Sequence, residues 1–238
     1  MDDLSSRFLD GFNVIEDWMR NTLDANEGEE FGSLLRRMEG SNTEVRRHSP
    51  EIKRFARLRN LIAHSHSHEK PLAVPTLVSV ERIESLGKLL VSPPSLFSLA
   101  AKPVEQCRPT DPLGCCVKKM HDGVFSQLPI YDGEKYFGLL TAETIARWLA
   151  TAFVGDGSGI VEEQPIKEVM RHQEDGDNVK FLARTATVVD ALAAFDQFLH
   201  RGKRLEALLI TNGGRQTESL IGIVTIHDIP KLNKALNG

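Results

Sequence analysis

A hydroxyl and a carboxylate stand three residues apart near the C-terminal end of the chain. Thr225 and Asp228 follow the apolar run 222–224, and threonine is a residue type that begins helices. The spacing puts both side chains within one helical turn, beside backbone N–H groups that favour an anion. Asp228 could accept both hydroxyls of a ribose while Thr225 faces the sugar or its first phosphate. The same pair could instead form a capping box that only stabilises the helix.

A second polar cluster ends a basic segment in the N-terminal half. Residues 50–64 show helical spacing, and Pro50 suits the first turn of the predicted helix. At about 100° per residue, Asn60 and His64 lie roughly 40° apart, whereas Arg59 points roughly 140° away from His64. A cationic helix face that carries an imidazole and an amide could handle a phosphate, although a solvated basic face has the same composition. The apolar stripe of this helix consists of Phe55, Leu58, Leu61 and Ile62.

In the C-terminal half, the elements that must position the polar residues occur twice. Residues 127–132 run into residues 138–141, and about eighty residues later 207–211 run into 222–228. Each copy is predicted to form a buried strand, a polar turn, a second buried strand and a helix. A duplication of this kind usually builds a cleft between its copies.

The duplicated half resembles a tandem pair of CBS domains, the adenosyl-ligand sensors named after cystathionine β-synthase. The resemblance covers about residues 95–236, with repeats at about 95–152 and 165–236. It rests on two motifs, Leu-Pro-h-h-Asp and Gly-h-h-Thr-x-x-Asp, where h is an apolar residue and x is any residue. It implies that the repeats pack with pseudo-twofold symmetry. Each site then joins the Thr-x-x-Asp of one copy to the opening strand and Leu-Pro region of the other. The implied adenine-nucleotide site consists of Val104, Phe125, Ser126, Thr225, His227 and Asp228.

The first copy departs from this pattern because Thr144 stands where the ribose-binding aspartate is expected. The second copy has Leu208 in place of Pro129 and a longer polar hairpin over residues 212–219. We therefore expect one good site per chain, for AMP, ADP or ATP as a regulatory ligand. S-adenosylmethionine or a cyclic dinucleotide would suit the same architecture.

The N-terminal half is predicted to be helical over residues 4–24, 29–39, 50–64 and 78–91. The Pro93-Pro94 pair predicts a domain boundary near residue 94. Four helices, the third ending in Arg59-Asn60-Leu61-Ile62-Ala63-His64, resemble a HEPN domain, whose signature is arginine, a polar residue and a histidine after four to six positions. Many HEPN domains are metal-independent ribonucleases that act as homodimers, and others serve only as binding modules.

The HEPN resemblance implies cleavage of single-stranded RNA by attack of a 2′-hydroxyl, leaving a 2′,3′-cyclic phosphate. In this mechanism His64 moves the proton, Arg59 holds the phosphoryl oxygens and Asn60 orients the site. Because the nucleophile is a 2′-hydroxyl, DNA is not expected as a substrate. The alternative is a non-catalytic nucleotide-sensing regulator that acts through dimerisation or partner binding.

Composition limits the remaining possibilities. The 238-residue chain has a net charge of −4 and a pI near 6.1, which gives no global signal for polyanion binding. Its three cysteines suit core positions in a reducing compartment, and the absence of a leader or long apolar run favours a cytoplasmic protein without a membrane span. His64, His66 and His68 could bind a transition metal if they alternated along a strand, but no metal is expected. Residues 155–159 are predicted to be a flexible connector.

Together these patterns predict an α+β protein with two domains. A HEPN-like helical bundle over residues 1–93 precedes an α/β tandem CBS pair over residues 94–238. The combined hypothesis is a ribonuclease whose activity is gated by an adenine nucleotide, through different affinities of the ligand for two arrangements of the protein.

Overall fold

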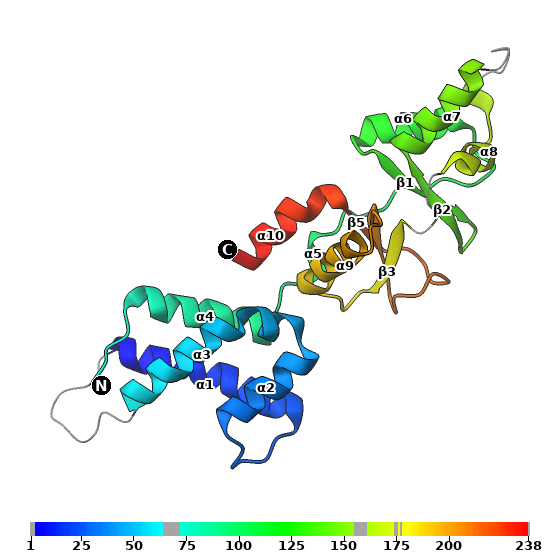
Figure 1. The fold of residues 1–238 in the computed structure, drawn as a ribbon. Helices are drawn as coiled ribbons and strands as arrows, with labels where there is room; N and C mark the ends of the chain where they lie inside the picture. The colour runs from blue at the N-terminus through cyan, green and yellow to red at the C-terminus, as the bar shows by residue number, and fades with distance from the viewer. Residues whose placement is uncertain (1–2, 64–71, 155–160, 174–175, 177, 238) are drawn as a thin grey trace. The chain divides into compact units, whose positions relative to one another are not determined.

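The computed structural model describes residues 3–63, 72–154, 161–173, 176 and 178–237 of the chain. It divides into two compact units, Met1–Pro94 and Ser95–Gly238 (Figure 1). The first unit is helical in its described residues, and the second combines strands and helices. The predicted α+β class, with a helical region followed by an α/β region, is confirmed.

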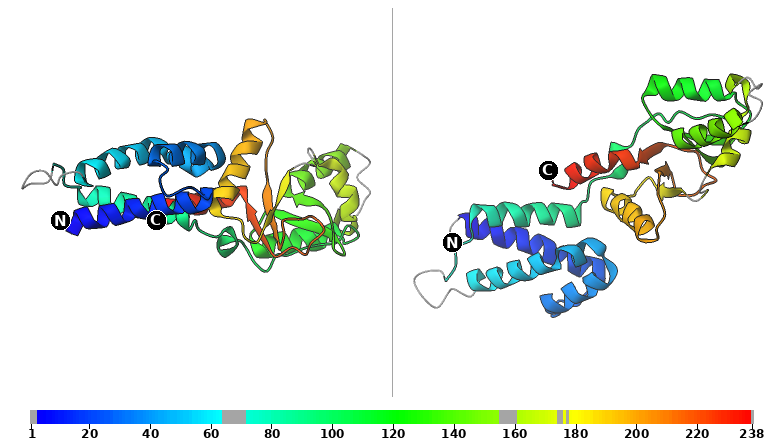
Figure 2. Two further views of the ribbon diagram at one scale, coloured as in Figure 1. Left: turned by 90° about the horizontal axis from the view of Figure 1, so that it is seen from below. Right: turned by 45° about the horizontal axis from the view of Figure 1, so that its top comes forward.

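In its described residues, the first unit contains four helices: α1 (Asp3–Leu23), α2 (Phe31–Ser41), α3 (Thr43–Ala63) and α4 (Leu77–Val91). Helix α1 runs alongside α4 (Figures 1 and 2). The two helices approach closely at Gly11, where a Cβ would lie 3.1 Å from Cγ2 of Ile83. Beside this contact, the guanidinium of Arg7 donates to both carboxylate oxygens of Glu84, each at 3.0 Å. The core is formed mainly by apolar residues of all four helices, including Phe8, Phe12, Leu34, Ile52 and Leu86.

Helix α3 corrects the prediction that this helix begins at Pro50. It begins seven residues earlier at Thr43, where Asn42 Oδ1 accepts from the backbone N–H of Val45 at 3.0 Å, and Pro50 lies inside it. A proline inside a helix costs about 3 kcal/mol. Full burial of an aliphatic side chain stabilises by about 1.5–3 kcal/mol, so the burial of Val45 by the added turns offsets much of the loss. The apolar stripe therefore decides where the helix begins.

The first copy in the C-terminal unit is built around a hairpin of β1 (Gln127–Asp132) and β2 (Lys135–Thr141). The strands are antiparallel, and Leu128 faces Leu140 in the register. Helices α6 (Leu113–Gly123) and α7 (Ala142–Val154) pack against this hairpin (Figures 1 and 2).

The second copy contains a three-stranded sheet in the order β3 (Val179–Ala183), β4 (Ala207–Thr211) and β5 (Gly222–Thr225). Strands β3 and β4 are parallel, and β4 and β5 are antiparallel. Helix α9 (Val188–His200) connects β3 to β4. After β5, a 3₁₀ turn over Ile226–Asp228 leads into α10 (Ile229–Asn237). The helix predicted to begin near Thr225 therefore begins as a 3₁₀ turn.

Each copy completes the core of the other. The short helix α5 (Leu96–Leu99) comes first in this unit, but Leu96 is buried with Val188 and Leu208 in the core of the second copy. The short helix α8 (Ile166–Val169) follows the first copy, and both of these bounding residues are buried in its core. A separate cluster, including Leu139, Leu209 and Ile223, joins the two sheets. The C-terminal unit is thus one interlocked body.

Candidate functional site

A cleft of about 780 Å³ lies between the two copies of the C-terminal unit. The second copy contributes the end of β5 and the 3₁₀ turn that follows it, and the first copy contributes the segment before β1 and the end of α6. All six residues implied by the CBS resemblance line this cleft: Val104, Phe125, Ser126, Thr225, His227 and Asp228.

The carboxylate of Asp228 is held by the start of its own helical segment. One oxygen, Oδ2, accepts from the backbone N–H of Thr225 at 2.8 Å and from the Thr225 hydroxyl at 3.1 Å. The other oxygen makes no hydrogen bond within the described part of the chain, and both side chains are half-buried. The capping arrangement therefore exists, and it orients a carboxylate that still has an oxygen available.

The opposite wall depends on a sharp turn at the end of α6. Val124 has a φ of 53° in the left-handed region, and the chain reverses there so that Phe125 and Ser126 reach the cleft. Gly123 is required by the same turn, because a Cβ there would lie 2.1 Å from the Phe125 ring. The segment before Val104 is fixed by pairing of the Ala101 and Ile223 backbones, at 2.9 Å and 3.3 Å.

The cleft also contains residues that sequence reasoning missed. His121, in the last turn of α6, and Gln127, the first residue of β1, both line it. Both lie within four residues of Phe125, so the turn at the end of α6 was the signal that could have identified them. The cleft therefore has an apolar wall, two carboxylates, of Glu105 and Asp228, as well as hydroxyls and two imidazoles.

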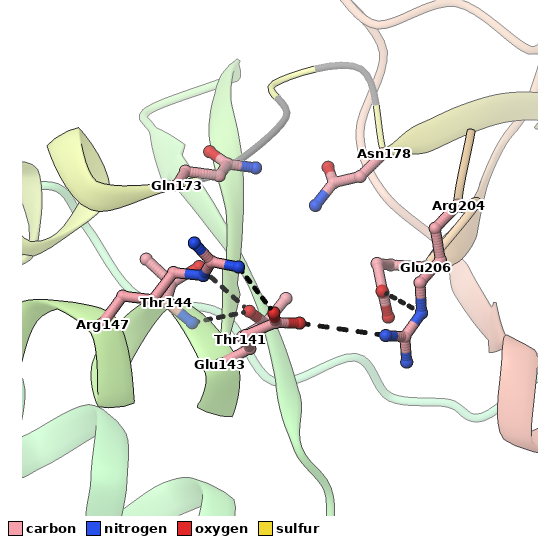
Figure 3. A pocket seen from close by; sticks show the side chains of 8 residues that line it. All are labelled: Thr141, Glu143, Thr144, Arg147, Gln173, Asn178, Arg204 and Glu206. Atoms are coloured by element: carbon pink, nitrogen blue, oxygen red, sulfur yellow. Dashed lines mark hydrogen bonds and ion pairs between the residues drawn. The ribbon is translucent and has the colours of Figure 1, made fainter. Parts of the chain in front are cut away.

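The equivalent cleft in the first copy is much smaller, at about 110 Å³ (Figure 3). Thr144 occupies the position of the missing aspartate and is 3% exposed. Its hydroxyl lies 3.0 Å from that of Thr141, and its backbone N–H donates to the same hydroxyl at 3.1 Å. Thr141 thus caps α7, and Thr144 presents no carboxylate to the cleft.

Two arginines and two carboxylates fill the space around Thr144 (Figure 3). Glu143 pairs with Arg147 at 3.1 Å and with Arg204 at 3.8 Å. Arg204 Nε also pairs with Glu206 at 2.7 Å. The other oxygen of Glu206 accepts from the amide of Gln127 at 2.6 Å. Gln127 borders the large cleft and Glu206 borders the small one, so this buried hydrogen bond joins the walls of the two clefts.

In the helical unit, the structure brings Arg59 and Asn60 together at a pocket of about 610 Å³ between α1, α2 and α3. Arg59 donates to the amide oxygen of Asn60 at 3.2 Å and lies 3.7 Å from a carboxylate oxygen of Glu16. Its guanidinium also stands over the Phe12 ring, 5.6 Å from the centroid. His64 lies outside the residues that the structure describes, so the expected Arg59, Asn60 and His64 constellation stays a prediction.

Two of the three cysteines lie in the core, as predicted. Cys107 and Cys116 are buried, but Cys115 is exposed, because α6 turns it away from the core that holds Cys116. The prediction of Cys115 as a core residue was therefore wrong.

Among the described residues there is no group of three or more His, Cys, Asp or Glu side chains that could hold a metal ion. His64, His66, His68 and the connector 155–159 lie outside the described residues. No helix in the described ranges is long and apolar enough to cross a membrane.

Comparison with known proteins identifies part of the C-terminal unit. Residues 97–151 match the family model of the CBS domain, so the chain contains a CBS domain in this range. No curated protein gave a significant match.

Several solved structures are similar to this chain. A putative acetoin utilization protein, AcuB, from Vibrio cholerae shares 19% identity over 60% of this chain and 92% of its own, with a TM-score of 0.44. CbpB in complex with c-di-AMP shares 16% identity over 66% and 94%, with a TM-score of 0.45. CBSX2 in complex with AMP shares 9% identity over 61% and 99%, with a TM-score of 0.42.

Proposed function

We propose that the C-terminal unit is a sensor of an adenine nucleotide and that the protein is a regulatory, nucleotide-binding protein. The observation that carries this proposal is the composition of the larger cleft. Thr225, His227 and Asp228 come from one copy and face Val104, Phe125 and Ser126 from the other. Its volume of about 780 Å³ lies in the usual range of small-molecule sites. The CBS domain at residues 97–151 supports the same class of ligand.

Each part of an adenine nucleotide has a matching group in the cleft. The Phe125 ring and Val104 offer an apolar surface for the planar base. The free oxygen of Asp228 can accept from the ribose hydroxyls, because an ionised carboxylate only accepts. Ser126 and His227 can donate to the phosphate. AMP, ADP and ATP share all three parts, and the binding assay below also includes S-adenosylmethionine and c-di-AMP.

Calorimetric titration of the full chain with AMP, ADP, ATP, S-adenosylmethionine and c-di-AMP tests the site. We expect Asp228→Ala to weaken binding roughly 10- to 100-fold, since it removes charged hydrogen bonds worth about 1.5–3 kcal/mol. Asp190→Ala is a matched control. Asp190 accepts from the backbone N–H and hydroxyl of Thr187, each at 2.8 Å, in the same type of cap at the start of α9, but it does not line the cleft. Unchanged affinity in Asp228→Ala would rule the site out.

A ribonuclease is the second candidate function, and one observation favours it. Arg59 and Asn60 touch each other at a pocket lined by four cationic side chains and three carboxylates, namely Arg36, Lys53, Arg57 and Arg59 with Glu16, Glu30 and Glu39. The cations are in slight excess, which suits a phosphate backbone. In this proposal His64 supplies the proton transfer, two protomers form a homodimer with one shared cleft, and the nucleotide sensor controls activity.

The two candidates are separated by incubating fluorescent single-stranded RNA with the full chain in EDTA, with and without AMP, ADP or ATP. A ribonuclease would release products that end in a 2′,3′-cyclic phosphate, and His64→Ala and Arg59→Ala would each abolish release. Cleavage by His64→Ala at the rate of the parent protein would exclude this mechanism. Nucleotide binding without cleavage would leave the non-catalytic regulator.

A further inference from the structure

The small cleft of the first copy is too small for a nucleotide. Its volume is about 110 Å³, against about 780 Å³ for the larger cleft. One buried water needs about 10–15 Å³ on this measure, so the small cleft has room for several waters or a small ion. It is well below the roughly 300 Å³ at which sites for drug-sized or nucleotide-sized ligands begin.

The groups around the small cleft are rich in hydrogen-bond donors. The side chains of Arg147 and Arg204 approach the Glu143 carboxylate from opposite sides (Figure 3). Gln173 and Asn178 extend toward the same space from the other wall (Figure 3). Asn178 is 7% exposed, and its amide nitrogen points toward this space (Figure 3). An amide N–H donates, so it suits an oxyanion or a water.

Thr144 also changes the charge of the small cleft. At the equivalent position the large cleft has Asp228, whose carboxylate suits a sugar and repels a nearby anion. Thr144 removes this negative charge and leaves a hydroxyl at the start of α7, where the backbone favours an anion. The small cleft therefore loses the group that would recognise ribose and becomes more favourable for an oxyanion.

We propose that the small cleft binds a free tetrahedral oxyanion, such as inorganic phosphate, between Arg147 and Arg204. Glu143 lies between these arginines in the structure and stands in for the anion. The side chains of Glu143, Arg147 and Arg204 are 51%, 44% and 62% exposed, so their ion pairs contribute little and can be exchanged. A phosphate carries more charge than a carboxylate and matches the guanidinium forks better.

Glu206 holds Arg204 in position when Glu143 moves away from it. The side chain of Glu206 is 12% exposed, binds Nε of Arg204 at 2.7 Å and accepts from Gln127 at 2.6 Å. This leaves the terminal nitrogens of Arg204 directed at the small cleft. Because the contact to Glu206 does not involve Asp228, this proposal does not depend on nucleotide binding.

Calorimetric titration of the full chain with sodium phosphate tests the proposal. Sodium chloride keeps the ionic strength constant. We expect saturable binding in the parent protein. Glu143→Gln should bind phosphate several-fold more tightly, because it removes the competing carboxylate, and Arg147→Ala should bind it about tenfold more weakly. Arg171→Ala is the control, since Arg171 is also exposed and ion-paired, with Glu168 at 2.7 Å, but lies outside the cleft.

His227→Ala distinguishes the two clefts, because His227 can donate to a phosphate in the large cleft and does not line the small one; it should leave binding of free phosphate unchanged. Phosphate binding that is lost in His227→Ala but kept in Arg147→Ala would assign the ion to the larger cleft and overturn the proposal. Heats no larger than those with chloride would overturn it too. The gain expected for Glu143→Gln does not depend on a variant that loses function, so a folding defect cannot imitate it.

Discussion

The two carboxylate oxygens of Asp228 have different surroundings. Sequence reasoning treated a helix cap and a sugar-binding carboxylate as alternatives, but the geometry accommodates both. One oxygen is bound by Thr225 at 2.8 Å and 3.1 Å, and the other remains available to the cleft. Spacing within the sequence identified the residue pair, and the resemblance to CBS domains indicated what would face it. The small size of the first cleft could not be predicted, because it depends on the rotamers of Arg147 and Arg204.

A residue-scale prediction concerns the acid sensitivity of the helical unit. Arg82 donates to both oxygens of Glu51 at 2.8 Å, and this hydrogen bonding lowers the pKa of the Glu51 carboxyl despite partial burial. A lowered folded-state pKa stabilises the protein above the ordinary glutamate value of about 4.3, and this stability is lost as the pH falls through the folded-state value.

We therefore expect Arg82→Ala to flatten the decline in the free energy of unfolding between about pH 5 and pH 3. The effect should be modest because the pair is partly exposed. Urea denaturation of the parent and variant, followed by circular dichroism at several pH values, measures it. Arg54→Ala, which removes an exposed cation of α3, serves as a control. An identical pH dependence in parent and Arg82→Ala would contradict the role of this pair.

At the scale of elements, apolar spacing predicted α1, α2 and α4 to within two residues at each end, because each helix must bury a continuous stripe. It missed the first seven residues of α3, since a proline was taken as a helix start. The parallel strand β3 was implied only through the CBS resemblance. All five of its residues are half-buried, so no alternation of buried and exposed positions marks it.

The internal position of Pro50 leads to a prediction about stability. In α3, proline at this position cannot donate to the carbonyl of Arg46. We expect Pro50→Ala to raise the free energy of unfolding by about 1–2 kcal/mol, because the restored hydrogen bond exceeds the entropy that proline removes from the unfolded chain. Chemical denaturation checks this. Pro112→Ala, at the cap before α6, should give no such gain. A destabilised Pro50→Ala would show that the helix needs a local distortion there.

At the scale of the whole molecule, the repeat allowed the duplicated architecture to be predicted, but not the exchange of α5 and α8 between the two cores. These helices have only four residues each, too few for a recognisable period. Each short helix packs where the core of the other copy has room for its apolar side chains, and this room exists only when the two copies are assembled.

The exchange predicts that neither copy folds alone. Residues 95–160 lack Ile166 and Val169 for the first core, and residues 161–238 lack Leu96 for the second. We expect each fragment to have little fixed tertiary structure by near-ultraviolet circular dichroism. An equimolar mixture should recover the signal and the AMP affinity of the intact unit 95–238. A cooperative thermal transition in either fragment by itself would contradict the expectation.

Because Leu208 stands in the place of Pro129, Gln127 and Glu206 occupy corresponding positions, each two residues earlier. They bond to each other at 2.6 Å. If two identical chains met in this way, the same residue would confront itself, and two glutamates would repel. Joining the copies covalently lets one become the donor and the other the acceptor. Once that asymmetry exists, each half is free to diverge in what it recognises, as an aspartate on one side and a threonine on the other illustrate.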